Sequence, residues 1–235
     1  MQQDRLAGAA TGPQDMARTG DRAAREVAMP RLSLPGRETP LTSPAEINEA
    51  LAAVGARLWP LDLGTAPDDI RRLLPMPSLG EADAARVRAH FLMPRARLLE
   101  IVAAAGRTLH VAGGGALETL DATHAVPYPE LYQVEPGTDY SRFDRFHVNV
   151  AEDGAAVDEF MQVLHGTGVR LLQRLPGGGS FELELGCSDA RTGWLVSYDG
   201  GVQHIGSFTA CAPGTKILMQ IIGPARWIMR YEGEG

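Results

Sequence analysis

The chain has 235 residues, 44% of them hydrophobic and 22% charged, which fits one globular domain of up to about 200 residues with extensions. Its formal net charge of −7, without a basic run, argues against binding to nucleic acid or to an anionic membrane. The longest apolar runs fall short of the roughly 20 residues of a membrane span, and no signal-peptide pattern begins the chain. We therefore expect a cytoplasmic protein in which Cys187 and Cys211 are free thiols.

The N-terminal part of the chain is predicted to be a disordered arm followed by a helical segment. Residues 1–40 are rich in Ala, Arg, Gln, Gly and Pro and lack apolar periodicity, which predicts the arm. Met29 is an alternative start of the native protein. Residues 41–108 are predicted to be helical and to pack on the outside of the following domain. The run 43–46 has the pattern of a capping box with Pro at the first helical position, and Gly55 ends that helix.

Three more helices are predicted in this segment from apolar spacing and from the Pro and Gly residues that bound them: 68–74, 81–92 and 95–105. His90 lies on the second of these, where a lone His is expected at the surface or in the core. The loop 113–115, with His110 and His124 nearby, lacks the Lys and the Ser or Thr of a phosphate-binding loop. These residues therefore predict no function.

From Leu109 onward the apolar period changes to two, which indicates strands. We expect strands at 131–134, 143–150, 159–165, 169–175, 180–185, 216–222 and 226–231, and two more on either side of the turn 199–201. Gly166 and Gly168 are predicted to end the 159–165 strand in a turn. Short strands punctuated by Gly and Pro predict a mainly β fold, with residues 109–235 forming a jelly-roll barrel.

Four side chains in this β region form a candidate metal site. His147 and Asn149 lie two residues apart on one strand, so both side chains point to the same face. Pairing with the next strand is expected to place Glu159 opposite them, and His204 follows the turn 199–201. Imidazole and carboxylate groups are ligands of non-haem iron and of its neighbours in the divalent series. We predict that His147, Asn149, Glu159 and His204 bind a metal.

Alternation along the strand that begins near Asp158 predicts the surroundings of this site. If Glu159 faces inward, so do Met161 and Val163, which would line an apolar cavity. A carboxylate among such neighbours needs a partner or a metal. Tyr132 and Tyr198 are further candidates for the substrate pocket. Two loop carboxylates, Glu152 and Asp153, are the alternative to Glu159 as the acidic ligand.

The spacing of these residues resembles the two sequence motifs of the cupin superfamily. The first cupin motif is His-x-His followed by a Glu, six residues and a Gly, and here Glu159 precedes Gly166 by that distance. The second is Gly, five residues, Pro-x-Gly, two residues and His, which Gly193 and His204 match, with Asp199 in place of the Pro. Asn149 stands where the second His of the first motif is expected. The resemblance implies a double-stranded β-helix barrel.

Among cupins, the chain is most similar to the acireductone dioxygenases. The run 158–162 before Gly166 and Gly168, and the run 51–60 with its Trp-Pro, look like stretches of those enzymes. The loop between Asn149 and Glu159 is longer than in that family, and Met161 replaces an Arg that lines the family's pocket. An Asn in the second ligand position also occurs in cupins that cleave hydroquinone rings.

The resemblance implies a non-haem Fe(II)-dependent dioxygenase that uses O2 to cleave a small enediol, diketone or dihydroxyaromatic, with Ni(II) or Mn(II) as alternative metals. Two other functions stay open. One is a metal cupin without redox chemistry, such as a lyase, isomerase or epimerase, with Tyr198 or Tyr132 as base. The other is a metal-free binding module. No catalytic residue is assigned. Neither nucleic acid nor a membrane is expected as a partner, and a homodimer is left open.

Overall fold

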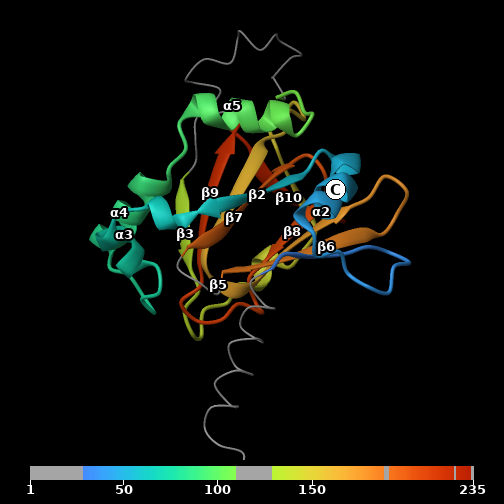
Figure 1. Ribbon diagram of the computed structural model, residues 1–235. Coiled ribbons are helices and arrows are strands. Elements are labelled where there is room, and N and C mark those ends of the chain that lie inside the picture. The colour runs from blue at the N-terminus through green and yellow to red at the C-terminus, as the bar shows by residue number, and fades with distance from the viewer. Residues whose placement is uncertain (1–28, 110–128, 188–190, 225, 234–235) are drawn as a thin grey trace, which may run out of the picture.

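The architecture is mainly β, as the strand spacing predicted. The computed structural model describes residues 29–109, 129–187, 191–224 and 226–233. A large antiparallel sheet carries the helices on its outside (Figure 1). Residues 1–28 of the expected arm lie outside the described residues, as do His110, the loop 113–115 and His124.

Ten strands are present in the described part of the chain: β1 Arg31–Ser33, β2 Arg57–Asp62, β3 Glu130–Gln133, β4 His147–Val150, β5 Asp158–Arg174, β6 Ser180–Cys187, β7 Thr192–Asp199, β8 His204–Ser207, β9 Lys216–Ile222 and β10 Ile228–Tyr231. Two of them were not predicted. The strand β1 lies inside the expected disordered arm and pairs with β6, and β2 lies inside the predicted helical segment and pairs with β7 along its whole length. Both segments therefore extend the sheet instead of remaining outside it.

The central strand is β5, which has 17 residues. Its N-terminal half, 158–163, lies between β7 and β9, whereas its C-terminal half, 169–174, lies between β6 and β8. This single strand therefore joins two parts of the sheet. One part contains β2, β7, β9 and β3, and the other contains β1, β6, β8, β4 and β10. The predicted turn at 166–168 was wrong, because the chain bends there within one continuous strand.

Two glycines make this bend sterically feasible. Gly166 and Gly168 have φ angles of 91° and 84°, in the left-handed region that favours Gly. A Cβ atom at Gly166 would lie 2.7 Å from Cα of Thr215, and one at Gly168 would lie 2.7 Å from the carbonyl carbon of Ala210. The neighbouring chain thus passes too close for a side chain at either position.

We expect Gly168→Ala to lower the free energy of unfolding by about 2–5 kcal/mol, since it combines left-handed strain with a backbone clash. Gly137→Ala is the matched control. Gly137 also has a positive φ, 81°, but a Cβ there would meet no atom within 4 Å, so strain alone remains. We expect the control to lose about 1–2 kcal/mol. Urea denaturation of both variants measures the difference, and equal losses would contradict the role given to the close packing at the bend.

The helices lie close to their predicted bounds. They are α2 Pro44–Leu51, α3 Asp68–Leu73, α4 Glu81–Phe91 and α5 Arg95–Ala104, and short 3₁₀ turns occupy Ala52–Val54, Leu63–Thr65 and Ser141–Phe143. Pro44 begins α2 as predicted. The capping box was wrong, however, because Ser43 precedes the helix without a side-chain hydrogen bond to it. None of the helices in the described ranges is long and apolar enough to cross a membrane.

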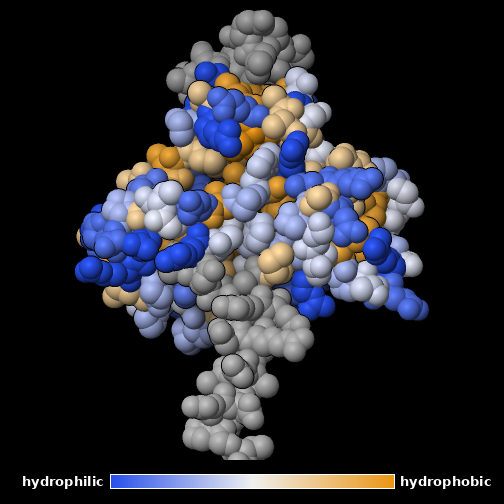
Figure 2. All heavy atoms as spheres, viewed as in Figure 1, coloured by the Kyte–Doolittle hydropathy of each residue, from blue (hydrophilic) through white to orange (hydrophobic). Residues whose placement is uncertain are grey.

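The helices cover the outer face of the sheet. Three residues of α5, Leu98, Ile101 and Val102, pack against Phe160, Leu195 and Ile222. Hydrophobic residues accordingly gather around α5 in Figure 2, whereas the visible surface of α3 and α4 is mostly hydrophilic. A second apolar cluster, between the two parts of the sheet, contains Met161, Val163, Leu171, Phe181, Leu183 and Val196. The residues of β5 thus alternate between the outer face and the interior.

A buried ion pair ties the segment after α5 to the sheet. Nε of Arg107 donates to Oδ1 of Asp158 at 2.7 Å, and a terminal guanidinium nitrogen donates to Oγ of Ser197 at 2.6 Å. The other terminal nitrogen donates to the carbonyl oxygen of Gly55. The Arg107 and Asp158 side chains are 8% and 1% exposed. One cation therefore connects the turn after α2 with β5 and β7.

Candidate functional site

The four predicted ligands meet in the interior of the protein. His147 and Asn149 come from β4, Glu159 from the first residues of β5, and His204 begins β8. All four are buried, with exposed fractions between 1% and 4%. His147 is paired in register with His204, and their ring centroids are 4.4 Å apart. The sequence therefore placed these side chains in one site.

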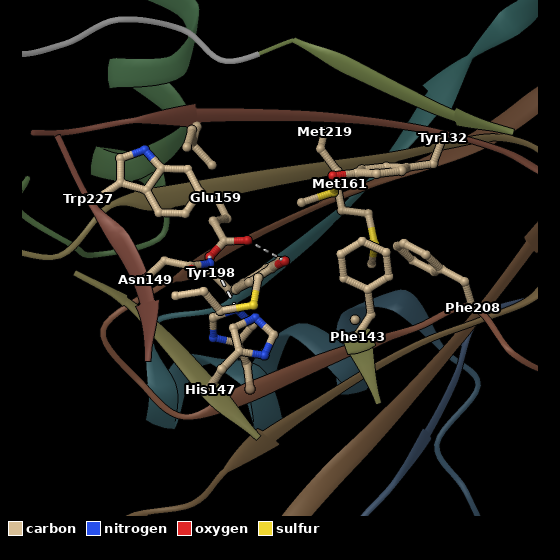
Figure 3. A pocket seen from close by; sticks show the side chains of 14 residues that line it. Tyr132, Phe143, His147, Asn149, Glu159, Met161, Tyr198, Phe208, Met219 and Trp227 are labelled. Carbon is tan, nitrogen blue, oxygen red and sulfur yellow. Dashed lines mark hydrogen bonds and ion pairs between the residues drawn. The ribbon is translucent and has the colours of Figure 1, made fainter. Parts of the chain in front are cut away.

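The predicted route by which Glu159 reaches the site was wrong. The strand β4 does not pair with the N-terminal half of β5, because its partners are β8 and β10. Instead Glu159 belongs to the opposite part of the sheet and faces His147, Asn149 and His204 across the interior (Figure 3). The site thus lies between the two parts of the sheet that β5 joins.

Three side chains surround the carboxylate of Glu159. Nδ2 of Asn149 donates to Oε1 at 2.7 Å, and the hydroxyl of Tyr198 donates to Oε2 at 2.9 Å. Nε2 of His204 lies 3.2 Å from Oε1. Burial alone would raise the pKa of Glu159, but His204, Asn149 and Tyr198 together outweigh it and hold the pKa below its usual value. Glu159 is therefore an ionised carboxylate in a buried site.

Backbone carbonyls fix the orientation of both imidazole rings. Nδ1 of His147 lies 2.8 Å from the carbonyl oxygen of Arg145, and Nδ1 of His204 lies 2.8 Å from that of Val202. A neutral ring that donates from Nδ1 presents the lone pair of Nε2 on its other side, which is the form that binds metals. Burial and the nearby His204 lower the pKa of His147, which favours its neutral form. Burial also opposes the charge of His204, but the Glu159 carboxylate outweighs this and raises its pKa.

The donor set fits a divalent metal in its chemistry. Oδ1 of Asn149 is buried and has no hydrogen-bond partner among the described residues, and Nε2 of His204 is buried with the Glu159 carboxylate 3.2 Å away. Two donor atoms that each lie about 2.1 Å from one ion, at right angles to each other, are about 3.0 Å apart. Nε2 of His204 and Oε1 of Glu159 lie at a similar separation, 3.2 Å. Within the described ranges, however, no three His, Cys, Asp or Glu side chains form a ready-made metal site. For Asn149 to be a ligand, its amide must turn Oδ1 toward the ion, because Nδ2 now donates to Glu159.

A small cavity adjoins these polar residues. Measured to the centre of a water-sized sphere, it has a volume of about 70 Å³. The polar end is formed by His147, Asn149, Glu159, Tyr198 and His204. The remaining wall is mainly apolar and consists of Tyr132, Phe143, Met161, Gly206, Phe208, Met219, Ile221, Trp227 and Met229. Figure 3 shows Tyr132, Phe143 and Phe208 beside Met161 and Met219.

Comparison with known proteins bears on the fold. No protein-family model matches the sequence, and no curated protein matches it. Among solved structures, an acireductone dioxygenase from Bacillus anthracis, with a cadmium ion in its active centre, matches with a TM-score of 0.58 and 14% sequence identity. The match covers 87% of this chain and 99% of that chain. The two proteins share a fold. At this level of identity, the chemistry must be argued from the residues themselves.

Three of the four predicted pocket residues line the cavity: Tyr132, Met161 and Tyr198. Val163 was wrong. It is fully buried in the core, two residues beyond Met161 toward the bend in β5, and is not among the residues that line the cavity. The alternative carboxylates, Glu152 and Asp153, are exposed, and Asp153 accepts a hydrogen bond from the backbone of Ala155 in their own loop.

The two tyrosines already have hydrogen-bond partners. The hydroxyl of Tyr198 donates to Glu159, and that of Tyr132 donates to Oε2 of Glu130 at 2.9 Å. Burial and the Glu159 carboxylate raise the pKa of Tyr198 well above its usual value. Its hydroxyl therefore keeps its proton, which argues against Tyr198 as a general base.

Several lining residues were missed at the sequence level. Met219 and Ile221 had a usable signal, since they alternate on β9 and pair in register with Met161 and Glu159. Phe143, Phe208 and Trp227 lie outside the strands, so no two-residue period marks them. Their positions depend on how the connecting segments fold over the cavity.

Proposed function

We propose that this protein is a metal-dependent dioxygenase that oxidatively cleaves a small enediol, diketone or dihydroxyaromatic, with Fe(II) as its metal. The observation that carries the proposal is the buried carboxylate of Glu159 with Nε2 of His204 at 3.2 Å and the buried Oδ1 of Asn149, which has no hydrogen-bond partner in the described part of the chain. The likeness in fold to an acireductone dioxygenase supports it. We also infer that the strands follow the double-stranded β-helix of the cupins, because β5 contributes to both parts of the sheet.

The ion would be held by Nε2 of His147 and His204, the carboxylate of Glu159 and Oδ1 of Asn149. When bound, a divalent iron supplies a Lewis acid that brings O2 and two adjacent substrate oxygens together. Glu159 is the only anionic group of the four, so it offsets the positive charge. Tyr198 fixes the Oε2 side of that carboxylate, and the carbonyls of Arg145 and Val202 fix the rings.

The apolar wall has a separate task, which is to exclude water. Met161, Met219 and Ile221 lie on the same side of the cavity as Glu159, on strands that pair with one another. Removing water from the site strengthens the electrostatic interaction of the carboxylate with a bound ion, because the local dielectric constant falls.

Metal analysis and oxygen uptake test the proposal together. We expect about one divalent metal per chain after native purification or anaerobic reconstitution. Oxygen consumption should then appear with Fe(II), and with Ni(II) or Mn(II) as alternatives, for acireductone, catechol or hydroquinone analogues. Treatment with a chelator should abolish it. Bound metal without oxygen uptake for any metal and substrate would contradict the assignment as a dioxygenase.

Tyr198→Phe is expected to lower the metal affinity about 10–100-fold, as is typical for a side chain that orients a ligand. The change removes only the hydroxyl that donates to Oε2 of Glu159. Tyr140→Phe is the matched control, because its hydroxyl donates to the backbone of Gln133 and does not touch the ligands. Isothermal titration of the metal-depleted proteins with Zn(II) measures both affinities. Equal affinities would show that Tyr198 does not position the carboxylate.

A metal-free binding module is the second candidate, and one observation favours it. Glu159 accepts hydrogen bonds from Asn149 and Tyr198 and lies 3.2 Å from Nε2 of His204, so protein groups by themselves satisfy its buried carboxylate. Negligible metal content together with ligand binding that a chelator leaves unchanged would support this candidate. A metal enzyme without redox chemistry would instead show turnover that is the same with and without oxygen.

A further inference from the structure

We infer that the substrate of this site is an electrically neutral molecule with a single apolar ring attached to its two reacting oxygens. The inference rests on the proposed function and narrows its substrate class. It excludes substrates that carry a carboxylate, a phosphate or an ammonium group into the cavity. Charge, aromatic contacts and size each contribute to it.

Away from the metal site, the described wall of the cavity offers no counterion for an anionic substituent. In the described part of the chain, none of the residues that line it is Arg or Lys. The carboxylate of Glu159 would repel an anionic substituent. At the aromatic end, the guanidinium of Arg142 is exposed and stacks over Phe143 at 4.5 Å from the ring centroid. Burying a carboxylate or phosphate without a partner is strongly unfavourable.

A cationic substituent is also poorly accommodated. Among the described residues of the lining, Glu159 is the only one with a carboxylate, and Asn149, Tyr198 and His204 already contact it. Aromatic rings can hold a cation, but the guanidinium of Arg142 already lies over Phe143. A second cation at this ring would be repelled by the first. The aromatic wall is therefore suited to an uncharged partner.

The shape of the wall favours a ring. Tyr132, Phe143 and Phe208 contact one another, with centroid separations of 5.4–5.7 Å, and together form a continuous aromatic surface. Met161 and Met219 face the same space (Figure 3), and thioethers make favourable contacts with aromatic edges. At about 10–15 Å³ for each water centre, the cavity volume corresponds to roughly five to seven waters, which is the space of one small ring with its substituents.

Three small catechols, whose substituents differ by at most two non-hydrogen atoms, test the inference: 4-methylcatechol, 3,4-dihydroxybenzoate and 3,4-dihydroxybenzylamine. They share the two adjacent oxygens and differ only in a neutral, anionic or cationic substituent. Binding to the full chain is measured by calorimetry under anaerobic conditions, after loading with Zn(II), which has no redox chemistry. We expect the neutral probe to bind at least about 10-fold more tightly than either charged probe, since the charged substituents would be buried without partners.

A pair of variants tests the aromatic wall. Phe208→Leu is expected to weaken binding of 4-methylcatechol about 3–10-fold, as expected for loss of one aromatic contact. Phe91→Leu makes the same change on α4, outside the cavity, and should leave the affinity unchanged. Thermal melts confirm that both variants are folded, and Phe143→Leu serves in place of Phe208→Leu if the latter unfolds.

The outcomes separate this inference from the proposed function. Tighter or equal binding of a charged probe overturns the inference and leaves the metal site standing. Metal binding without binding of any probe also overturns it. If Zn(II) does not bind but the neutral probe is still preferred, the proposed function fails and the inference on substrate charge is supported.

Discussion

Glu159→Gln is expected to lower the metal affinity by at least about 100-fold, more than the effect of side chains that only support ligands. The substitution keeps the size of the side chain but removes the only negative charge among the four ligands. A buried divalent ion would then lack a compensating anion. Metal content after dialysis, together with a thermal melt of each protein, measures the effect.

For the other three ligands, the loss of metal affinity on substitution should follow the strength of the donor atom that is removed. His147→Ala and His204→Ala should also abolish metal binding, because each removes an imidazole. Asn149→Ala should be milder, since water replaces a neutral amide oxygen, and Asn149→His should tighten the site. Asp153→Asn in the exposed loop is the control and should bind metal normally. A folded Glu159→Gln that retains its metal, beside an Asp153→Asn that loses it, would show that the loop supplies the carboxylate.

The second large effect concerns stability. Arg107→Met is expected to lower the free energy of unfolding by about 3–5 kcal/mol, the usual cost of breaking a buried ion pair by removing one partner. The change leaves the carboxylate of Asp158 buried without its cation and removes the hydrogen bond to Ser197. Urea denaturation followed by circular dichroism gives the unfolding free energy.

An exposed ion pair provides the matched control. Arg97 and Glu100 on α5 form a pair at 3.0 Å, but their side chains are 52% and 65% exposed. Arg97→Met should therefore change stability by less than about 1 kcal/mol. If Arg107→Met lost no more than this control, the pair with Asp158 would have no special part in holding the segment after α5 on the sheet.

Local sequence patterns predicted the helices well. Helices α3, α4 and α5 begin at their predicted residues, because Pro and Gly bound them and the apolar spacing has a helical period. The strands β1 and β2 were missed since short extended segments acquire their structure from partners far along the chain. The bend at Gly166 and Gly168 was read as a turn, because the sequence shows that a positive φ is allowed but not which chain passes beside it.

The sequence predicted which residues form the candidate site better than it predicted which strands bring them together. The spacing along the sequence predicted that His147, Asn149, Glu159 and His204 form one site, and all four line the same cavity. The sequence did not show that Glu159 comes from the opposite part of the sheet. Val163 was misplaced because strict alternation takes no account of where the cavity ends. Whether these residues bind a metal stays a prediction.

The pairing of the early strands with late ones also shapes how the chain is made. Arg57 of β2 pairs with Ser197 of β7, and Arg31 of β1 pairs with Glu184 of β6. At the usual rate of synthesis of about 5–20 residues per second, some 140 residues take roughly 7–28 s. During that time β2 has left the ribosome without its partner, and its buried Leu58 has no core to enter. During this interval the unpaired edge of β2 is exposed to pairing with a neighbouring molecule, and faster synthesis of the segment between β2 and β7 shortens that exposure.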